Sequence, residues 1–200
     1  LEDGADKMTP VAAIGLFDEF RSLIPLGEKG DEMIRKIADR LVAVDLLDQA
    51  ALVLERQIQF RVTGVDRARI GARLALVYLL NRTPQKAIDV LHDTTAVDAG
   101  RDLNTQRRRL EARALTDLGK VNEAMLLLGT DTTPETRQLR AEVYWRTQDW
   151  PNAARALSEL VPEADAGTLS DANARLVLDW ATALTLAGDE RTLVRVRQRY

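Results

Sequence analysis

The 200-residue chain lacks cysteine and long apolar runs, and it has few aromatic residues. Without cysteine there is no disulfide, no zinc–thiolate site and no thiol nucleophile. Phe, Trp and Tyr together account for only 4% of the residues. The longest uncharged stretch, residues 8–17, is well short of the ~20 apolar residues that a helix needs to cross a bilayer. We therefore predict no direct membrane insertion of this segment.

An excess of positive charge and a strand-forming composition are also missing. The 28 basic residues are outnumbered by 31 acidic ones, and the net charge of −3 gives no general case for nucleic-acid binding. Few stretches are rich in Val, Ile and Thr, the residues that favour strands. Ala and Leu supply most of the apolar side chains, and both are strong helix formers, as are Arg and Glu. The composition predicts an all-α protein.

Proline, glycine and capping residues divide the chain into eleven predicted helices. Pro10, Pro84 and Pro134 each stand at the start of one of them. The connections within helix pairs are very short, so the paired helices must lie antiparallel. The predicted helices cover about residues 10–24, 31–44, 47–62, 65–80, 84–92, 103–118, 121–128, 134–147, 150–160, 170–186 and 190–200, and residues 162–168 form a loop.

A set of small and bulky residues recurs in these helices. Ala13, Ala50, Ala87 and Ala124 follow one another at steps of 37 residues. Two helices of a hairpin approach closely where a small side chain faces the partner backbone, and large residues one turn away fill the remaining space. In the first helix of each pair the small and bulky residues are Ala38 and Leu41, Ala75 and Tyr78, Ala112 and Leu115, Ala141 and Tyr144, and Ala181 and Leu184. In the second helix they are Ala50 and Leu54, Ala87 and Leu91, Ala124 and Leu128, Ala153 and Leu157, and Leu193 and the off-pattern Arg197.

This pattern resembles the tetratricopeptide repeat (TPR) family. That family has a small residue at its eighth position, an aromatic residue at its eleventh, alanine at its twentieth and a large apolar residue at its twenty-fourth, in a repeat of about 34 residues. Ala75, Tyr78, Ala87 and Leu91 fit well, as does the set that begins at Ala141, whereas the other repeats lack the aromatic residue. The steps here are 37, 37, 37, 29 and 40 residues, which predicts extended loops and one clipped second helix around residues 125–128. The resemblance implies a right-handed α-solenoid of antiparallel helix hairpins, a TPR-like superhelix.

We expect residues 1–200 to form a single TPR-like helical repeat domain. Its helix pairs are residues 31–62, 65–94, 101–129, 134–161 and 170–200. Residues 1–27, with Ala13, Phe17 and Phe20, match the second half of a repeat whose first half is absent. The last helix also lacks a polar capping helix, so we expect a piece of a longer bacterial array, with a divergent N-terminal cap as the alternative.

Few residues suggest chemistry. His92, the only histidine, is predicted near a helix end, where the helix dipole favours a cation, and no nucleophile or orienting group stands in a usable local arrangement. Acidic pairs such as Asp18-Glu19 and Asp189-Glu190 fall at helix starts or on polar faces. There is no phosphate-binding glycine loop and no His-rich metal spacing. We predict no catalysis, no cofactor and no metal site.

The resemblance implies that the first helix of each pair lines an inner, concave surface. Its centre carries Arg69, Arg109 and Arg113, with Arg146 near them. Such a cluster can receive the carboxylates of an acidic peptide segment, and ordinary solvated arginines are the alternative. The Lys and Asn residues by which some family members clamp a terminal carboxylate are not at these places. The inner positions implied by the resemblance are Glu32, Arg35, Asp39, Arg69, Ala72, Leu76, Leu79, Gln106, Arg109, Arg113, Thr116, Glu135, Gln138, Glu142, Trp145, Arg146, Arg175, Leu178 and Thr182.

Trp145 has two interpretations, as an aromatic anchor for a partner on the inner surface or as a partly buried packing residue. With the arginines, it leads us to expect a protein–protein interaction scaffold that binds a peptide segment or partner protein on its concave face. An inert module that positions a catalytic or membrane-anchored region of a larger protein is one alternative. Self-association into a homo-oligomer through exposed repeat ends is another.

Overall fold

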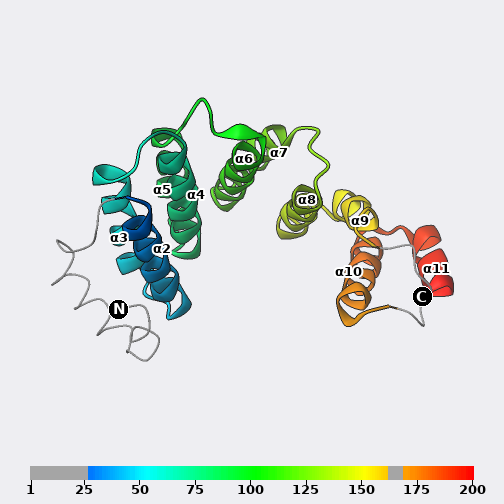
Figure 1. Cartoon of the computed structure of the whole chain (residues 1–200). Coiled ribbons are helices and arrows are strands. Elements are labelled where there is room, and N and C mark those ends of the chain that lie inside the picture. The colour runs from blue at the N-terminus through cyan, green and yellow to red at the C-terminus, as the bar shows by residue number, and fades with distance from the viewer. Residues whose placement is uncertain (1–26, 162–168) are drawn as a thin grey trace. The chain divides into compact units, whose positions relative to one another are not determined.

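The computed structural model describes residues 27–161 and 169–200. Those residues form ten α-helices, labelled α2 to α11, and no strand (Figure 1). The helices are α2 (Glu28–Ala43), α3 (Leu47–Phe60), α4 (Gly64–Leu80), α5 (Pro84–Asp93), α6 (Gly100–Asp117), α7 (Val121–Leu128), α8 (Pro134–Arg146), α9 (Trp150–Ser158), α10 (Asp171–Ala187) and α11 (Glu190–Arg199). The predicted all-α class is confirmed for the described residues.

Each of these ten helices begins and ends within three residues of its predicted bounds. The clipped second helix is confirmed as α7, which has only 8 residues. The predicted helix at residues 10–24 and the loop at 162–168 lie outside the described residues, as does the half repeat assigned to residues 1–27 apart from Gly27.

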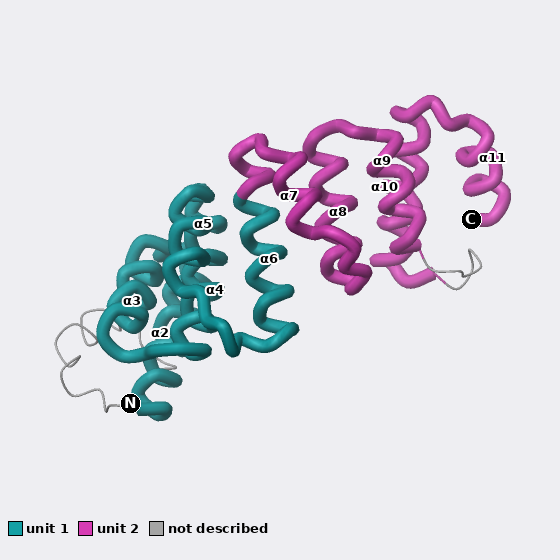
Figure 2. The backbone as a smooth tube through the Cα atoms, turned by 90° about the horizontal axis from the view of Figure 1, so that it is seen from above, with its two compact units in different colours: residues 1–114 teal, residues 115–200 magenta. Residues whose placement is uncertain are grey.

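The chain divides into two compact units, residues 1–114 (unit 1) and 115–200 (unit 2), and the division falls within α6 (Figure 2). In unit 1, α2 packs against α3, α3 against α4, and α4 against α5. In unit 2, α7 packs against α8, α8 against α9, α9 against α10, and α10 against α11. Each of these contacts joins two helices that follow one another in the sequence. That residues 1–200 form one repeat domain stays a prediction.

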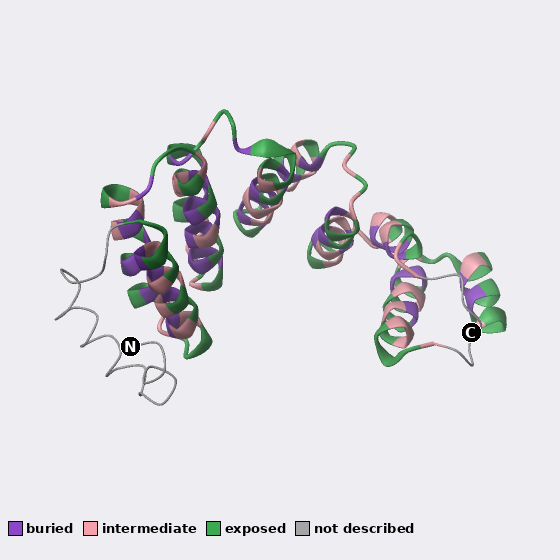
Figure 3. Cartoon of the chain, viewed as in Figure 1, coloured by how far each residue is buried: buried purple, intermediate pink, exposed green. Residues whose placement is uncertain are grey.

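The recurring small residues are buried. Buried and exposed residues alternate along the helices (Figure 3), and the alanines of the repeat fall on the buried side. Ala38, Ala75 and Ala112 are at most 1% exposed. Their second-helix counterparts Ala50, Ala87, Ala124 and Ala153 are completely buried. The side chain at these positions is small because a neighbouring helix lies directly against it.

The last hairpin departs from this arrangement. Ala181 is only half-buried, whereas Ala183, two residues on, is completely buried. Leu184 and Leu193 still occupy the core of unit 2, at 3% and 9% exposed. The off-pattern Arg197 is exposed. The repeat register is therefore kept in α10 and α11 by the large residues rather than by the alanine.

The turns inside the five hairpins share one backbone geometry. In each turn one residue has a positive φ, between 54° and 77°. The N–H of the following residue then donates to the carbonyl five positions back, at 2.8–3.0 Å. This is the hydrogen bond that defines a Schellman C-cap. The positive-φ residues are Asp45, Arg82, Gly119, Gln148 and Gly188, which are spaced by the same 37, 37, 29 and 40 residues as the alanines.

Candidate binding surfaces

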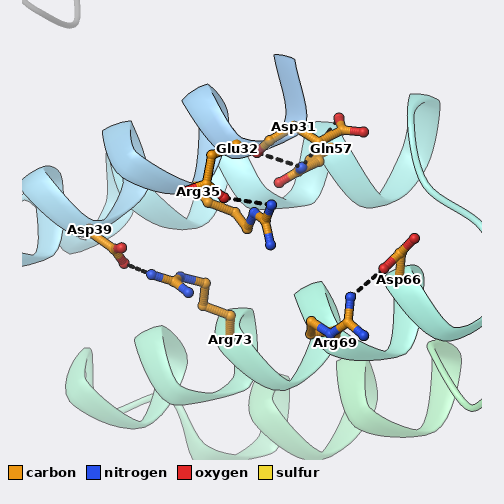
Figure 4. A network of polar contacts seen from close by, with 8 residues as sticks. All are labelled: Asp31, Glu32, Arg35, Asp39, Gln57, Asp66, Arg69 and Arg73. Atoms are coloured by element: carbon orange, nitrogen blue, oxygen red, sulfur yellow. Dashed lines mark hydrogen bonds and ion pairs between the residues drawn. The ribbon is translucent and has the colours of Figure 1, made fainter. Parts of the chain in front are cut away.

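The first helices of unit 1 carry a row of ion pairs (Figure 4). Arg69 Nη1 lies 2.5 Å from Asp66 Oδ1, one turn earlier in α4. Arg35 Nη2 lies 2.6 Å from Glu32 Oε2 in α2. A third pair joins Arg73 of α4 to Asp39 of α2 and so connects the first helices of two successive hairpins. The positive charges on this surface are matched locally by carboxylates.

Arg73 is the arginine of this row that the sequence did not single out. Burial lowers the pKa of Arg73, repulsion by Arg35 lowers it further, and attraction to Glu32 raises it. The inner positions carried over from the family skip residue 73 and include Ala72 and Leu79, which are buried, and Leu76, which is exposed. The charge pattern Asp39–Arg73, on successive first helices, was the signal that could have identified this residue.

A buried amide holds the start of α2 against α3. Gln57 is 1% exposed, and its Nε2 donates to the backbone oxygen of Asp31 at 3.3 Å and to Asp31 Oδ1 at 3.4 Å. Arg61 Nε also donates to Asp31 Oδ1, at 2.9 Å. Asp31 thus accepts hydrogen bonds from two side chains at the end of α3, which fixes the hairpin on which Glu32 and Arg35 stand.

Arg69, Arg109 and Arg113 all belong to unit 1. Arg69 is exposed and paired with Asp66. Arg109 and Arg113 are half-buried on α6, and each already interacts with other groups of the protein. Exposed pairs of this kind contribute only ~0–1 kcal/mol to stability, so a carboxylate ligand can replace Asp66 at little cost. That the three arginines act as one cluster stays a prediction.

Arg107 of α6 is a buried arginine that was not identified from the sequence. It is 7% exposed. Its Nη1 donates to the backbone oxygen of Ala68 at 2.6 Å and to Thr94 Oγ1 at 3.2 Å, and its Nη2 donates to the backbone oxygen of Leu91. Burial lowers the pKa of Arg107, against the attraction of Glu111. One side chain of α6 thereby joins α4 to the end of α5.

His92 stands in the last turn of α5 with an exposed side chain, as predicted. Its Nε2 lies 2.8 Å from Glu111 Oε1 of α6. This contact spans two helices of unit 1, α5 and α6.

In unit 2, Trp145 packs against Trp150. Their ring centroids are 5.4 Å apart and the rings are nearly perpendicular, at 88°. Trp145 and Trp180 are half-buried and pack against the core of the unit. Arg146 is exposed and its Nη1 lies 2.6 Å from Asp117 Oδ1. The packing role of Trp145 is therefore present, and its use as an anchor for a partner stays a prediction.

An open hollow of about 380 Å³ lies among α9, α10 and α11. Trp180 and Leu184 of α10 form its apolar part, and Asp189 and Thr192 stand at the start of α11. Hydrogen bonds from Thr192 lower the pKa of Asp189, because they stabilise the carboxylate that caps α11. Asp189 is therefore engaged as a helix cap, and Arg155 and Ser158 of α9 are the other polar residues of this hollow.

Among the described residues, no three His, Asp or Glu side chains gather closely enough to hold a metal ion. None of the helices formed by residues 27–161 and 169–200 has the length and apolar character needed to span a membrane. Comparison of the chain with protein-family models, curated proteins and solved structures finds no match. The resemblance to TPR proteins therefore rests on the residues of this chain alone.

Proposed function

We propose that this chain is a helical-repeat binding module of the tetratricopeptide type, without catalysis of its own. It binds a peptide segment or partner protein along the first helices of its hairpins. The observation that carries the proposal is the shared register of the hairpins: a positive-φ turn recurs in all five, and buried small residues recur at the same spacing in the first four. Repeats of this kind present extended surfaces rather than closed pockets.

The finer fold that we propose is a right-handed α-solenoid of TPR-like hairpins. It is supported by the packing of consecutive helices from α2 to α5 in unit 1 and from α7 to α11 in unit 2. A hairpin cannot bury its apolar face alone, and stacking against the next hairpin provides the missing contact. Within each unit, the first helices then offer a surface on which a partner can lie.

The chemistry of unit 1 favours an acidic partner. Arg69 and Arg73 are held by carboxylates on exposed parts of α2 and α4, so the surface already binds acids of its own. A ligand carboxylate can take the place of Asp66, and the guanidinium fork of Arg69 can hold it through two hydrogen bonds. Arg109 and Arg113 extend the basic positions onto α6, and Trp145 provides an apolar anchor in unit 2.

The test begins with peptides selected against the protein from a random display library. We expect the selected peptides to be rich in Asp and Glu. Replacing Arg69, Arg109 and Arg113 by serine should weaken the binding of a selected peptide by at least about tenfold and flatten the salt dependence of its affinity. Fluorescence anisotropy measures both.

The matched control replaces three exposed arginines outside the inner positions, Arg101, Arg191 and Arg197, by serine. This variant has the same net charge as the first and should bind the peptide almost as the original protein does. Equal weakening in both variants, or in neither, would show that the predicted surface does not recognise the peptide.

A further inference from the structure

A small pocket in unit 2 is lined by three arginines. It lies between α8 and α9 and has a volume of about 130 Å³. The polar residues of its wall are Arg137, Arg140, Tyr144, Asn152, Arg155 and Glu159. Three guanidinium groups and one carboxylate leave the wall with an excess of two positive charges.

Two of the arginines stand where most other first helices have packing residues. Arg137 and Arg140 lie four residues and one residue before Ala141. In α6 the residue that corresponds to Arg140 is Glu111, which contacts His92. The residues at the two positions are Ile34 and Ile37 in α2, Gly71 and Leu74 in α4, Arg108 and Glu111 in α6, and Val177 and Trp180 in α10. Only α8, among the described first helices, has a cation at both. A departure from the packing pattern of this kind is typical of a functional position.

The protein fixes one of these cations and leaves the other two without partners. Arg140 Nη2 donates to the backbone oxygen of Leu128, at 3.4 Å, and to that of Gly129, which ties the guanidinium to the end of α7. Within the described part of the chain, nothing accepts a hydrogen bond from the guanidinium of Arg137 or Arg155, and Glu159 forms no ion pair with them.

Arg137 also carries a buried donor without an acceptor. Its Nε is shielded from solvent and has no hydrogen-bond partner. A buried N–H that is left unpaired lowers the stability of the folded state. A ligand oxygen that reaches this N–H removes the penalty, so we expect the folded protein to gain stability when the pocket is filled.

We propose that this pocket binds a phosphate group. A phosphate monoester carries about −1.5 to −2 charges at pH 7, which matches the excess of two positive charges better than a single carboxylate does. The planar guanidinium fork pairs with two oxygens of a phosphate at once, and the hydroxyl of Tyr144 adds a neutral donor. All six polar residues belong to unit 2, whereas Arg69, Arg109 and Arg113, the arginines replaced in the peptide test, belong to unit 1.

The test follows the Arg Nε–H resonances of the full chain by NMR during titration with inorganic phosphate and with O-phosphoserine. Chloride and acetate at equal ionic strength are the comparison. Phosphate should shift the resonance of Arg137 and raise the midpoint of thermal unfolding, and chloride should do neither. Tighter binding of O-phosphoserine identifies a phosphorylated side chain as the ligand, and equal binding identifies free phosphate. Acetate that binds as well as phosphate would refute the assignment.

Substitutions that are expected to change the phosphate affinity in opposite directions make the test independent of folding defects. Arg137→Gln and Arg155→Gln should each weaken phosphate binding by about tenfold. Glu159→Gln removes the one acid from the wall and should tighten phosphate binding a few-fold. Arg175→Gln, an exposed arginine of α10, should leave the affinity unchanged. No tightening in Glu159→Gln, or an equal loss in Arg175→Gln, overturns the proposal.

Discussion

Arg107 illustrates how a single buried side chain supports several backbone segments at once. The backbone oxygen of Leu91 lies in the last turn of α5, where carbonyl groups have no partner within the helix. Arg107 donates to it and also to Ala68 of α4 and Thr94. Arginine suits this role because its five donors are held in a rigid plane and it stays charged even when burial lowers its pKa.

We predict that Arg107→Met lowers the free energy of unfolding by about 2–4 kcal/mol, because it removes the buried hydrogen bonds to Ala68, Leu91 and Thr94. The neighbouring Arg108 is exposed and donates only to Thr105 Oγ1. Arg108→Met should therefore change the stability by no more than about 0.5 kcal/mol. Urea unfolding followed by circular dichroism measures both. Similar losses in the two variants would contradict the bridging role of Arg107.

Tyr78 gives the protein a pH dependence at the alkaline end. Its hydroxyl donates to Glu55 of α3, and burial, with this hydrogen bond and the charge of Glu55, raises the pKa of Tyr78 above its ordinary value. Folded Tyr78 therefore keeps its proton at a pH where the unfolded chain loses it.

The stabilisation is fully present below pH ~10, the ordinary pKa of tyrosine, and is lost as the pH rises above that value. We predict that the free energy of unfolding falls by up to about 1.4 kcal/mol per pH unit from this group. Tyr78→Phe should show a shallower decline in urea unfolding between pH ~9 and ~11. An equal slope in the two proteins would mean that Tyr78 does not titrate as its surroundings indicate.

At the scale of the helix and its turn, one backbone geometry recurs with different residues. Positive φ suits glycine, because any other residue brings its Cβ close to the backbone. Gly119 and Gly188 meet this requirement, whereas Asp45, Arg82 and Gln148 adopt the same conformation with a side chain. The turn is therefore imposed by the hairpin, and glycine is its most favourable occupant.

This comparison gives a pair of predictions with opposite signs. Gly119→Ala should destabilise the protein by about 1 kcal/mol. The added Cβ meets no atom within 4 Å, so the effect is conformational. Arg82→Gly should stabilise it by about 0.5–1 kcal/mol, since it relieves the strain of the positive φ. Thermal unfolding of the two variants measures both shifts, and shifts of the same sign would contradict a shared turn geometry.

At the scale of the whole molecule, the two compact units provide separate spectroscopic signals. All three tryptophans, Trp145, Trp150 and Trp180, belong to unit 2. Gly71 of unit 1 is a site where a substitution acts on that unit alone. A Cβ there would lie 1.9 Å from Thr94 Oγ1, and such overpacking costs about 1–3 kcal/mol.

We predict that Gly71→Ala lowers the midpoint of part of the unfolding transition followed by circular dichroism. The midpoint of the transition followed by tryptophan fluorescence should stay unchanged. Leu157→Ala, which empties a core position of unit 2, should shift the fluorescence transition instead. In repeat proteins each hairpin is stabilised mainly by its neighbours, so distant substitutions need not be felt. If both signals shift together in both variants, the units unfold as one cooperative body.

Much of the fold was predictable because it depends on neighbours in the sequence. Pro84 and Pro134 stand at helix starts, and the alanine spacing placed Ala38, Ala75 and Ala112 in the core, where they lie. The binding surface was less predictable. Arg69 was placed on an exposed face, but Ala72 and Leu79, assigned to the same face, are buried.

The sequence by itself determined the helices, their pairing and the register of the repeats, because these follow from hydrogen bonds and side-chain periodicity within about forty residues of chain. Only the tertiary structure decided what each arginine does. Arg107 is buried, Arg69 is paired, and Arg137 lines a pocket without a partner. The physical reason is that the role of a charge depends on its burial and on the partners that other helices bring to it.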